Sequence, residues 1–133
     1  MKLTQSRIVT QNVPQLVRFY EHLTCTVSEG GEDYVEFDFI SGGLAICSKR
    51  SADLFNACAA SPAANRSVIF DFQVEDVDKE RARLAGFIKE FVLEPTNQPW
   101  GNRSMIFRDP DGNLINFYTS INQSKEKIES DTL

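Results

Sequence analysis

The sequence predicts an α+β fold in which two βαβββ modules form a curved half-barrel sheet, with the helices on its outer face. Strand and helix signals occur in the same order twice, on either side of a connector at residues 49–66. The starts of the two modules also share a pattern, RIVTQNVPQLVRFY near the N-terminus and FDFQVEDVDKERARL after residue 69. One such unit is too small to bury its own sheet, which favours an assembly of both.

These signals divide the chain into one domain, residues 1–120, followed by a polar C-terminal tail at residues 121–133. Within the domain, we expect module one at 1–48, a linker at 49–66 and module two at 67–120. The linker is rich in Ala, Ser and Asn, and predicts one helical turn around Ala52–Ala59.

In module one, a short strand at Ser6–Gln11 leads into a helix that Asn12 caps and Pro14 enters in its first turn. Apolar residues at helical spacing predict the face that packs on the sheet: Val13, Leu16, Val17, Tyr20 and Leu23. Three more strands are expected, at Cys25–Ser28, Asp33–Ile40 and Leu44–Ser48.

In module two, Ser67–Val74 is a strong strand signal, and Asp76 caps a helix at Val77–Ala85 that ends at Gly86. The later strands are expected at Phe87–Leu93, Arg103–Arg108 and Leu114–Thr119. Before the last strand, Asp109-Pro110-Asp111-Gly112 has the composition of a tight turn, because Pro presets φ and Gly accepts a positive φ.

Composition excludes several classes of function. The net charge is −5 without a basic cluster, so a nucleic acid partner is not expected. The sequence has no run of about 18 apolar residues and no signal-peptide pattern, which predicts a cytoplasmic protein that does not cross a membrane. The three cysteines have no zinc-binding spacing, and we expect them to be reduced.

Strand alternation predicts which side chains line the inner face of the half-barrel. In SVIFDFQV, Val68, Phe70, Phe72 and Val74 should pack under the helices, which leaves Ile69, Asp71 and Gln73 on the inner face. The same alternation places Leu114, Asn116 and Tyr118 together on the last strand. In DYVEFDFI it separates Tyr34, Glu36 and Asp38 from Val35, Phe37 and Phe39.

Two motifs give the chain a family resemblance: FYE at the end of the first helix, and PWGNR followed by FRDPDGNLINFY in module two. With the duplicated βαβββ order, the chain resembles the vicinal oxygen chelate superfamily over roughly residues 1–120. That superfamily includes glyoxalase I, extradiol dioxygenases, fosfomycin resistance enzymes and bleomycin resistance proteins. The resemblance to bleomycin resistance proteins implies a homodimer.

The resemblance also implies where a metal would bind in catalytic members. Their ligands are typically His, Glu or Gln on the first, fourth, fifth and eighth strands, and these positions correspond to Gln5, Ala45, Ile69 and Asn116. Two of these residues have no donor atom, and the other two are neutral amides, which are poor ligands for a transition metal. The single histidine, His22, lies near the end of the first helix. We therefore expect no metal and no cofactor.

A small organic ligand, cationic or aromatic, is the expected partner. Trp100 and Tyr118 are candidates for stacking, and Asp71 and Glu36 for pairing with a positive group. Hydrogen bonds are expected from Asn116, Gln73 and Gln5, with Ile69 in the lining. Each candidate also has a structural explanation: Asp71, for example, can be paired with Arg66, Arg103 or another cation.

The sequence therefore favours a metal-independent small-molecule binding protein of the glyoxalase/bleomycin resistance type. Its ligand would lie in the cup formed by the inner face of the half-barrel sheet, and no catalytic residue is expected. The first alternative is a metal-dependent lyase or dioxygenase of the same superfamily with non-standard ligands. The second is a protein interaction module that uses Trp100 and its neighbours.

Overall fold

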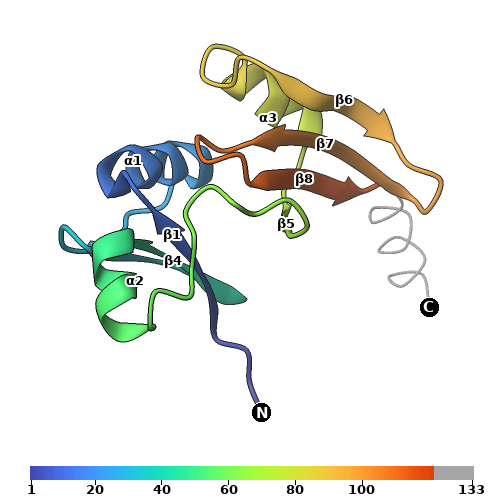
Figure 1. Ribbon diagram of the computed structural model, residues 1–133. Coiled ribbons are helices and arrows are strands. Elements are labelled where there is room, and N and C mark those ends of the chain that lie inside the picture. The colour runs from blue at the N-terminus through green and yellow to red at the C-terminus, as the bar shows by residue number, and fades with distance from the viewer. Residues whose placement is uncertain (122–133) are drawn as a thin grey trace. The chain divides into compact units, whose positions relative to one another are not determined.

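The computed structural model describes residues 1–121, which form two compact units (Figure 1). The first unit comprises Met1–Arg66 with Asp109–Asn113, and the second comprises Ser67–Arg108 with residues 114–121. Each unit contains a four-stranded sheet with mixed strand directions, which confirms the predicted α+β class with two modules. No helix in this part of the chain is both long enough and apolar enough to cross a bilayer. The predicted tail lies almost entirely outside the described residues.

The first sheet has the order β1-β4-β3-β2, with β1 parallel to β4 and the other pairs antiparallel. Its strands are β1 (Gln5–Thr10), β2 (Glu29–Gly30), β3 (Tyr34–Phe39) and β4 (Gly42–Ser48). Helix α1 (Val13–Thr24) is capped by Asn12, whose side chain accepts a hydrogen bond from the Gln15 amide, as predicted. Buried residues of the helix and the sheet form the core of the unit: Val13, Leu16, Tyr20, Leu23, Ile8, Val35, Phe37, Leu44 and Ile46.

The strand expected at Cys25–Ser28 is wrong, because strand pairing in this region is limited to Glu29–Gly30. Cys25 adopts a left-handed conformation with φ of 52° and ends helix α1. The Thr26 hydroxyl then donates to the Thr24 carbonyl, which holds the chain in a local turn. These local interactions outweigh the β propensity of the segment.

The connector contains a longer helix than the single turn expected there. Helix α2 (Lys49–Phe55) begins directly after β4, and its cap is the Ser48 hydroxyl, which accepts from the Ser51 amide. The ammonium group of Lys49 binds the Asp53 carboxylate one turn later at 2.6 Å. Because of this cap and this i,i+4 ion pair, the helix starts three residues before the expected turn at Ala52–Ala59.

The second sheet has the order β5-β8-β7-β6, with β5 parallel to β8 and the other pairs antiparallel. Its strands are β5 (Ile69–Gln73), β6 (Phe91–Asn97), β7 (Asn102–Arg108) and β8 (Leu114–Ser120). Helix α3 (Val77–Leu84) buries Val77 and Leu84 and is capped by Asp76, as predicted. The buried residues of β7 and β8 that form the core of this unit include Met105, Phe107, Ile115 and Phe117.

Strand β6 starts four residues later than the expected strand at Phe87–Leu93. The amides of Phe87 and Ile88 both donate to the carbonyl of Leu84, so these residues complete the end of helix α3 and are not free for a sheet. Ile88 is 6% exposed and belongs to the core. Alternation alone did not distinguish this helix end from a strand.

The turn between β7 and β8 is held by the carboxylate of Asp109, which is 5% exposed. Its Oδ1 accepts hydrogen bonds from the backbone amides of Asp111 and Asn113, each at 2.9 Å. Its Oδ2 accepts from the Asn113 amide group at 2.8 Å and from the Tyr20 hydroxyl at 2.7 Å. The predicted turn is therefore also a contact of helix α1, and it belongs to the first unit.

Candidate functional site

The second sheet has one face packed in the core of its unit and one face that carries most of the predicted site residues. We call the latter the open face, defined by Ile69, Asp71, Gln73, Leu114, Asn116 and Tyr118, with their β7 partners Ser104, Ile106 and Arg108. Phe70 and Phe72 alternate with these residues and are less exposed than Ile69, Asp71 and Gln73, as predicted. Val68 departs from the expectation, because it precedes the first paired residue of β5 and is 54% exposed.

Asp71 and Asn116 are direct partners across strands β5 and β8. The Asn116 Nδ2 atom donates a hydrogen bond to Asp71 Oδ1 at 2.9 Å. An ionised carboxylate only accepts hydrogen bonds, so it fixes the nitrogen of the Asn116 amide toward Asp71 and the oxygen away from it. That oxygen, Oδ1, is buried and has no hydrogen-bond partner among residues 1–121.

Arg66 and Arg103, which the sequence suggested as ion-pair partners of Asp71, have other partners. Arg103 forms a two-point contact with the carboxylate of Asp78, and Arg66 donates to the Asn65 carbonyl. Within residues 1–121, Asp71 has no ion pair, and its residue is exposed. Asp71 is therefore a carboxylate oriented by a neutral amide and open to a further partner.

Gln73 and Tyr118 form the next pair along β5 and β8, beside the Asp71–Asn116 pair. Tyr118 is half-buried, and Ser104 lies opposite it on β7. Ile69 pairs with Leu114 on the other side of Asp71 and is 48% exposed. The open face therefore has a polar centre between an apolar pair and a phenol ring.

Trp100 lies at the tip of the β6–β7 hairpin and is 72% exposed. The turn is closed by a hydrogen bond from the Gly101 amide to the Gln98 carbonyl, with Pro99 in its second position. Asn116 pairs with Ile106, four residues along β7 from its first residue, Asn102, or roughly 13 Å of strand. The structure thus separates Trp100 from Asp71 and Asn116 along the sheet.

In the first sheet, Gln5, Tyr34 and Glu36 form a chain of hydrogen bonds. Gln5 Nε2 donates to the Tyr34 hydroxyl at 3.0 Å, and this hydroxyl donates to Glu36 Oε1 at 2.7 Å. Glu36 pairs with Ala45 and Gln5 pairs with Gly43 on the intervening strand β4, so the phenol passes over Ala45 to reach both partners. Ala45 is 0% exposed.

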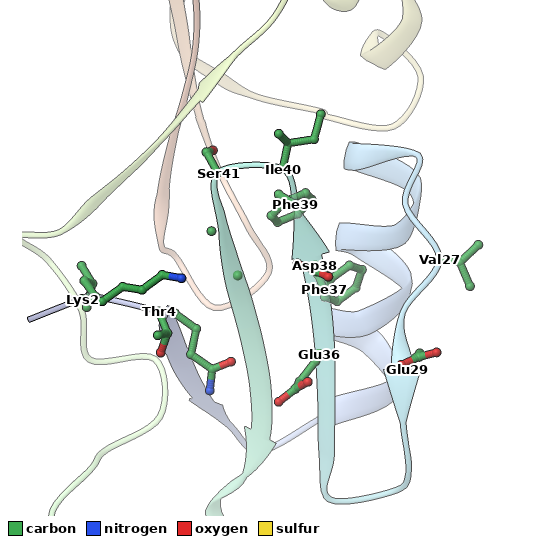
Figure 2. A pocket seen from close by; sticks show the side chains of 14 residues that line it. Lys2, Thr4, Val27, Glu29, Glu36, Phe37, Asp38, Phe39, Ile40 and Ser41 are labelled. Carbon is green, nitrogen blue, oxygen red and sulfur yellow. The ribbon is translucent and has the colours of Figure 1, made fainter.

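A hollow of about 640 Å³ lies beside Gln5 and Glu36 in the first unit. Figure 2 shows Lys2 and Thr4 on one side of it and Val27 and Glu29 on the other, with the β3–β4 hairpin between them. Its charged lining consists of three carboxylates, from Glu29, Glu36 and Asp38, and the single ammonium group of Lys2. Exposed apolar side chains border it, including Ile40 and Val27.

The residues at the four positions that the family resemblance implies for a metal do not suit one. Ala45 and Ile69 have no donor atom, the Gln5 amide nitrogen binds Tyr34, and the Asn116 amide nitrogen binds Asp71. In residues 1–121 no group of three or more His, Cys, Asp or Glu side chains is arranged to hold a metal ion. His22 lies in helix α1.

Sequence reasoning gave Tyr34 no role beyond its place on the same face of its strand as Glu36 and Asp38. The signal was available, since Gly43 and Ala45 occupy alternate positions of β4 and leave space above that strand for a large neighbour. It was not specific, because small residues in a strand also indicate bulges or close backbone contacts.

Comparisons with known proteins agree with the fold. The sequence profile of the Glyoxalase/Bleomycin resistance protein/Dioxygenase superfamily matches residues 2–117. The uncharacterized protein YraH of Bacillus subtilis (strain 168) is 30% identical over 129 residues, which cover 89% of this chain and 98% of YraH.

Two solved structures have the same fold. A glyoxalase/bleomycin resistance protein/dioxygenase from Nocardioides has a TM-score of 0.76 and 20% identity, with 91% of this chain and 84% of that chain covered. A family enzyme from Burkholderia phytofirmans PsJN has a TM-score of 0.79 and 14% identity, with 90% and 99% covered. From its sequence match and its fold, this chain belongs to the glyoxalase/bleomycin resistance protein/dioxygenase superfamily.

Proposed function

We propose that the protein binds a small organic ligand on the open face of the second sheet, without a metal ion and without breaking a bond in the ligand. The proposal rests on the hydrogen bond from Asn116 to Asp71. Asn116 stands at the position implied for a metal-binding glutamate, and its amide nitrogen orients a carboxylate instead. A neutral amide keeps hydrogen-bonding capacity but gives up the charge that a metal requires.

The unpartnered oxygen of Asn116 supports the same proposal. A buried polar atom without a hydrogen bond costs about 1–3 kcal/mol, so its presence calls for a reason. The atom is shielded from solvent, so a ligand donor reaches it only when the groups that cover it move. Functional sites are among the places where proteins tolerate such a cost.

The binding part of the proposal is tested by titrating a mixture of small aromatic and aliphatic compounds into the isotope-labelled full chain. We expect NMR shifts of the Asn116 side-chain amide and of the Asp71 and Tyr118 backbone amides. The shifts of the Asp71 and Tyr118 backbone amides should be lost in Asn116→Leu, which keeps most of the volume, and all three shifts should be retained in Gln11→Leu, which removes an exposed carboxamide before helix α1. Compounds that shift other regions while leaving these three residues unchanged would overturn the proposal.

The metal-free part is tested by thermal unfolding of chelator-treated protein with and without Mn²⁺, Ni²⁺ or Zn²⁺. We expect no stabilisation by any of the three ions, because the described residues offer no convergent set of donors. A rise of several degrees that disappears in Asp71→Ala would contradict the metal-free proposal.

The exposed Trp100 favours a second candidate function, binding of a partner protein at the β6–β7 hairpin. An indole that is 72% exposed in a turn fixed by Pro99 and Gly101 is suited to enter a pocket on another protein. Trp100→Ala should then abolish capture of that partner and leave the compound-induced shifts at Asn116 unchanged. Loss of those shifts in Trp100→Ala would instead assign the indole to the small-molecule site.

The proposal retains the cytoplasmic location and the homodimer that the sequence and the family resemblance imply. The oligomeric state is measured directly by sedimentation equilibrium of the full chain. A monomer across the accessible concentration range would remove the dimer from the proposal without affecting the ligand site on the second sheet.

A further inference from the structure

We infer that the ligand carries a compact cation with at least two N–H donors, such as a primary ammonium, an amidinium or a guanidinium group. This inference rests on the proposed function and assigns the chemical class of its ligand. It follows from the sign and the hydrogen-bonding type of the groups that the open face of the second sheet presents.

The centre of the open face offers acceptors. Asp71 is an exposed carboxylate with one hydrogen bond from Asn116, which leaves most of its lone pairs unused. The neighbouring Asn116 Oδ1 is a buried carbonyl acceptor that has no hydrogen-bond partner within residues 1–121. An exposed carboxylate with unused lone pairs on its two oxygens suits a group that is positive and donates more than one hydrogen bond.

Within residues 1–121, no lysine or arginine of the surrounding strands forms an ion pair with Asp71. Strands β5, β6 and β8 contain no lysine or arginine. On β7, Arg103 binds Asp78 and Asn97. Arg108 lies on the open face as the partner of Leu114, two residues along β7 from Ile106, the partner of Asn116. An anionic group placed directly at Asp71 would be repelled by its carboxylate, which disfavours carboxylates and phosphates at this position.

The residues on either side of the Asp71–Asn116 pair indicate what kind of body the cationic group is attached to. Tyr118 follows Asn116 on the same face of β8, and its half-buried ring offers a π face to a flat cation. On the other side of Asp71, the pair formed by Ile69 and Leu114 is apolar. A cationic group attached to an aromatic or aliphatic body matches this order of polar and apolar contacts.

The hollow of the first unit independently shows the same preference for charge. Three carboxylates and one ammonium group line it, so its own charged groups sum to a negative charge at neutral pH. The Tyr34 hydroxyl donates to Glu36 at 2.7 Å, and the apolar residues Val27 and Ile40 border the hollow (Figure 2). Both units thus present fixed carboxylates beside apolar side chains.

The test uses three probes of nearly the same shape: benzamidine, which is a cation, benzamide, which is neutral, and benzoate, which is an anion. Each is titrated into the labelled full chain, and binding is followed at the Asn116 side-chain amide and at the backbone amides of Asp71 and Tyr118. We expect benzamidine to bind at least about tenfold more tightly than either analogue. The affinity should fall as salt is added.

Two substitutions separate a specific contact from a general effect of charge. Asp71→Asn keeps the shape and removes the charge, and it should weaken benzamidine by about tenfold or more. Glu75→Gln removes one charge from an exposed position outside the open face and should leave the affinity within about twofold. Unfolding curves of both variants confirm that each remains folded.

The outcomes distinguish the inference from the function on which it rests. If benzamide or benzoate binds as tightly as benzamidine, or if Asp71→Asn keeps full affinity, the inference of a cationic ligand is wrong. The proposed ligand site on the open face is then retained. Benzamidine shifts confined to residues around the hollow, and lost in Glu36→Gln, would move the cation site to the first unit. If neither these probes nor the compound mixture shifts Asn116, both the class and the proposed function are wrong.

Discussion

The hydroxyl of Tyr20 donates a hydrogen bond to the carboxylate of Asp109 at 2.7 Å, and both groups are buried. The two residues are 89 positions apart and belong to the two motifs on which the family resemblance depends, FYE and RDPDGN. Asp109 also accepts three hydrogen bonds within its own turn, from Asp111 and Asn113. The contact therefore explains why a tyrosine in a helix and an aspartate in a distant turn occur together.

Replacing Tyr20 by Phe should lower the free energy of unfolding by about 1–3 kcal/mol. The substitution keeps the ring but removes the donor to a buried carboxylate, which then loses one of its four hydrogen bonds. The measurement is urea unfolding at pH 7. Tyr118→Phe, at a half-buried tyrosine, is the control, and we expect a change below about 0.5 kcal/mol there. Equal effects of the two substitutions would show that the Tyr20 hydroxyl has no special role.

The same contact predicts a loss of stability at alkaline pH. Burial, together with the adjacent Asp109 carboxylate, raises the pKa of Tyr20 well above its ordinary value of 10.0. A raised pKa in the folded state contributes stability that is complete below pH 10 and is lost as the pH rises toward the folded-state pKa. We expect the difference in unfolding free energy between the wild type and Tyr20→Phe to be constant below about pH 9 and to shrink above about pH 10. A difference that stays constant through pH 11 would contradict this account.

Replacing Ala45 by Leu should destabilise the first unit by about 1–3 kcal/mol. The larger side chain would occupy the space over which the Tyr34 phenol passes, so Tyr34 would lose its contacts with Gln5 and Glu36. Urea unfolding measures the stability, and the resonance of the Gln5 side-chain amide reports the broken contact. Ala59→Leu, at an exposed alanine in the connector, serves as the control and should change neither quantity. Retention of the Gln5 signal in Ala45→Leu would show that the phenol takes another path.

Replacing Asn116 by Glu should not create a metal site. The substitution supplies one carboxylate at the eighth-strand position, but the other three implied positions, Gln5, Ala45 and Ile69, still lack suitable ligands. Calorimetric titration with Mn²⁺, Ni²⁺ or Zn²⁺ should therefore give no saturable heat for the variant or for the wild type. At pH 7 the variant should be less stable than the wild type by about 1 kcal/mol, because two carboxylates then face each other across β5 and β8. Tight binding of one metal ion per chain would contradict the prediction.

Much of the fold followed from local signals in the sequence. The caps Asn12 and Asp76, the apolar spacing of helix α1 and the turn before β8 each have a short-range cause, and the structure contains all of them. The errors occurred where backbone groups were used by an adjacent helix end, at Cys25–Ser28 and at Phe87–Ile88. A β-like composition does not reveal that such amides and carbonyls already have partners.

The site was predictable to a smaller extent. Alternation placed Asp71, Gln73, Asn116 and Tyr118 on one face, because the side-chain period of a strand is a local property. The partner of Asp71 and the path of the Tyr34 phenol depend on strand register and on the length of hairpins, which the sequence does not state. Register likewise decides that Trp100 lies several residues along the sheet from Asn116.

The turn at Asp109–Asn113 makes the repeat in the sequence a poor guide to where the chain can be divided. A fragment that ends at the connector contains every strand and helix of the first module, yet it lacks the acceptor for the Tyr20 hydroxyl and the partner of Asn65. The first unit thus includes residues that are synthesised some 40 positions after Arg66. During synthesis, the Tyr20 hydroxyl has no Asp109 acceptor until most of the chain has been made.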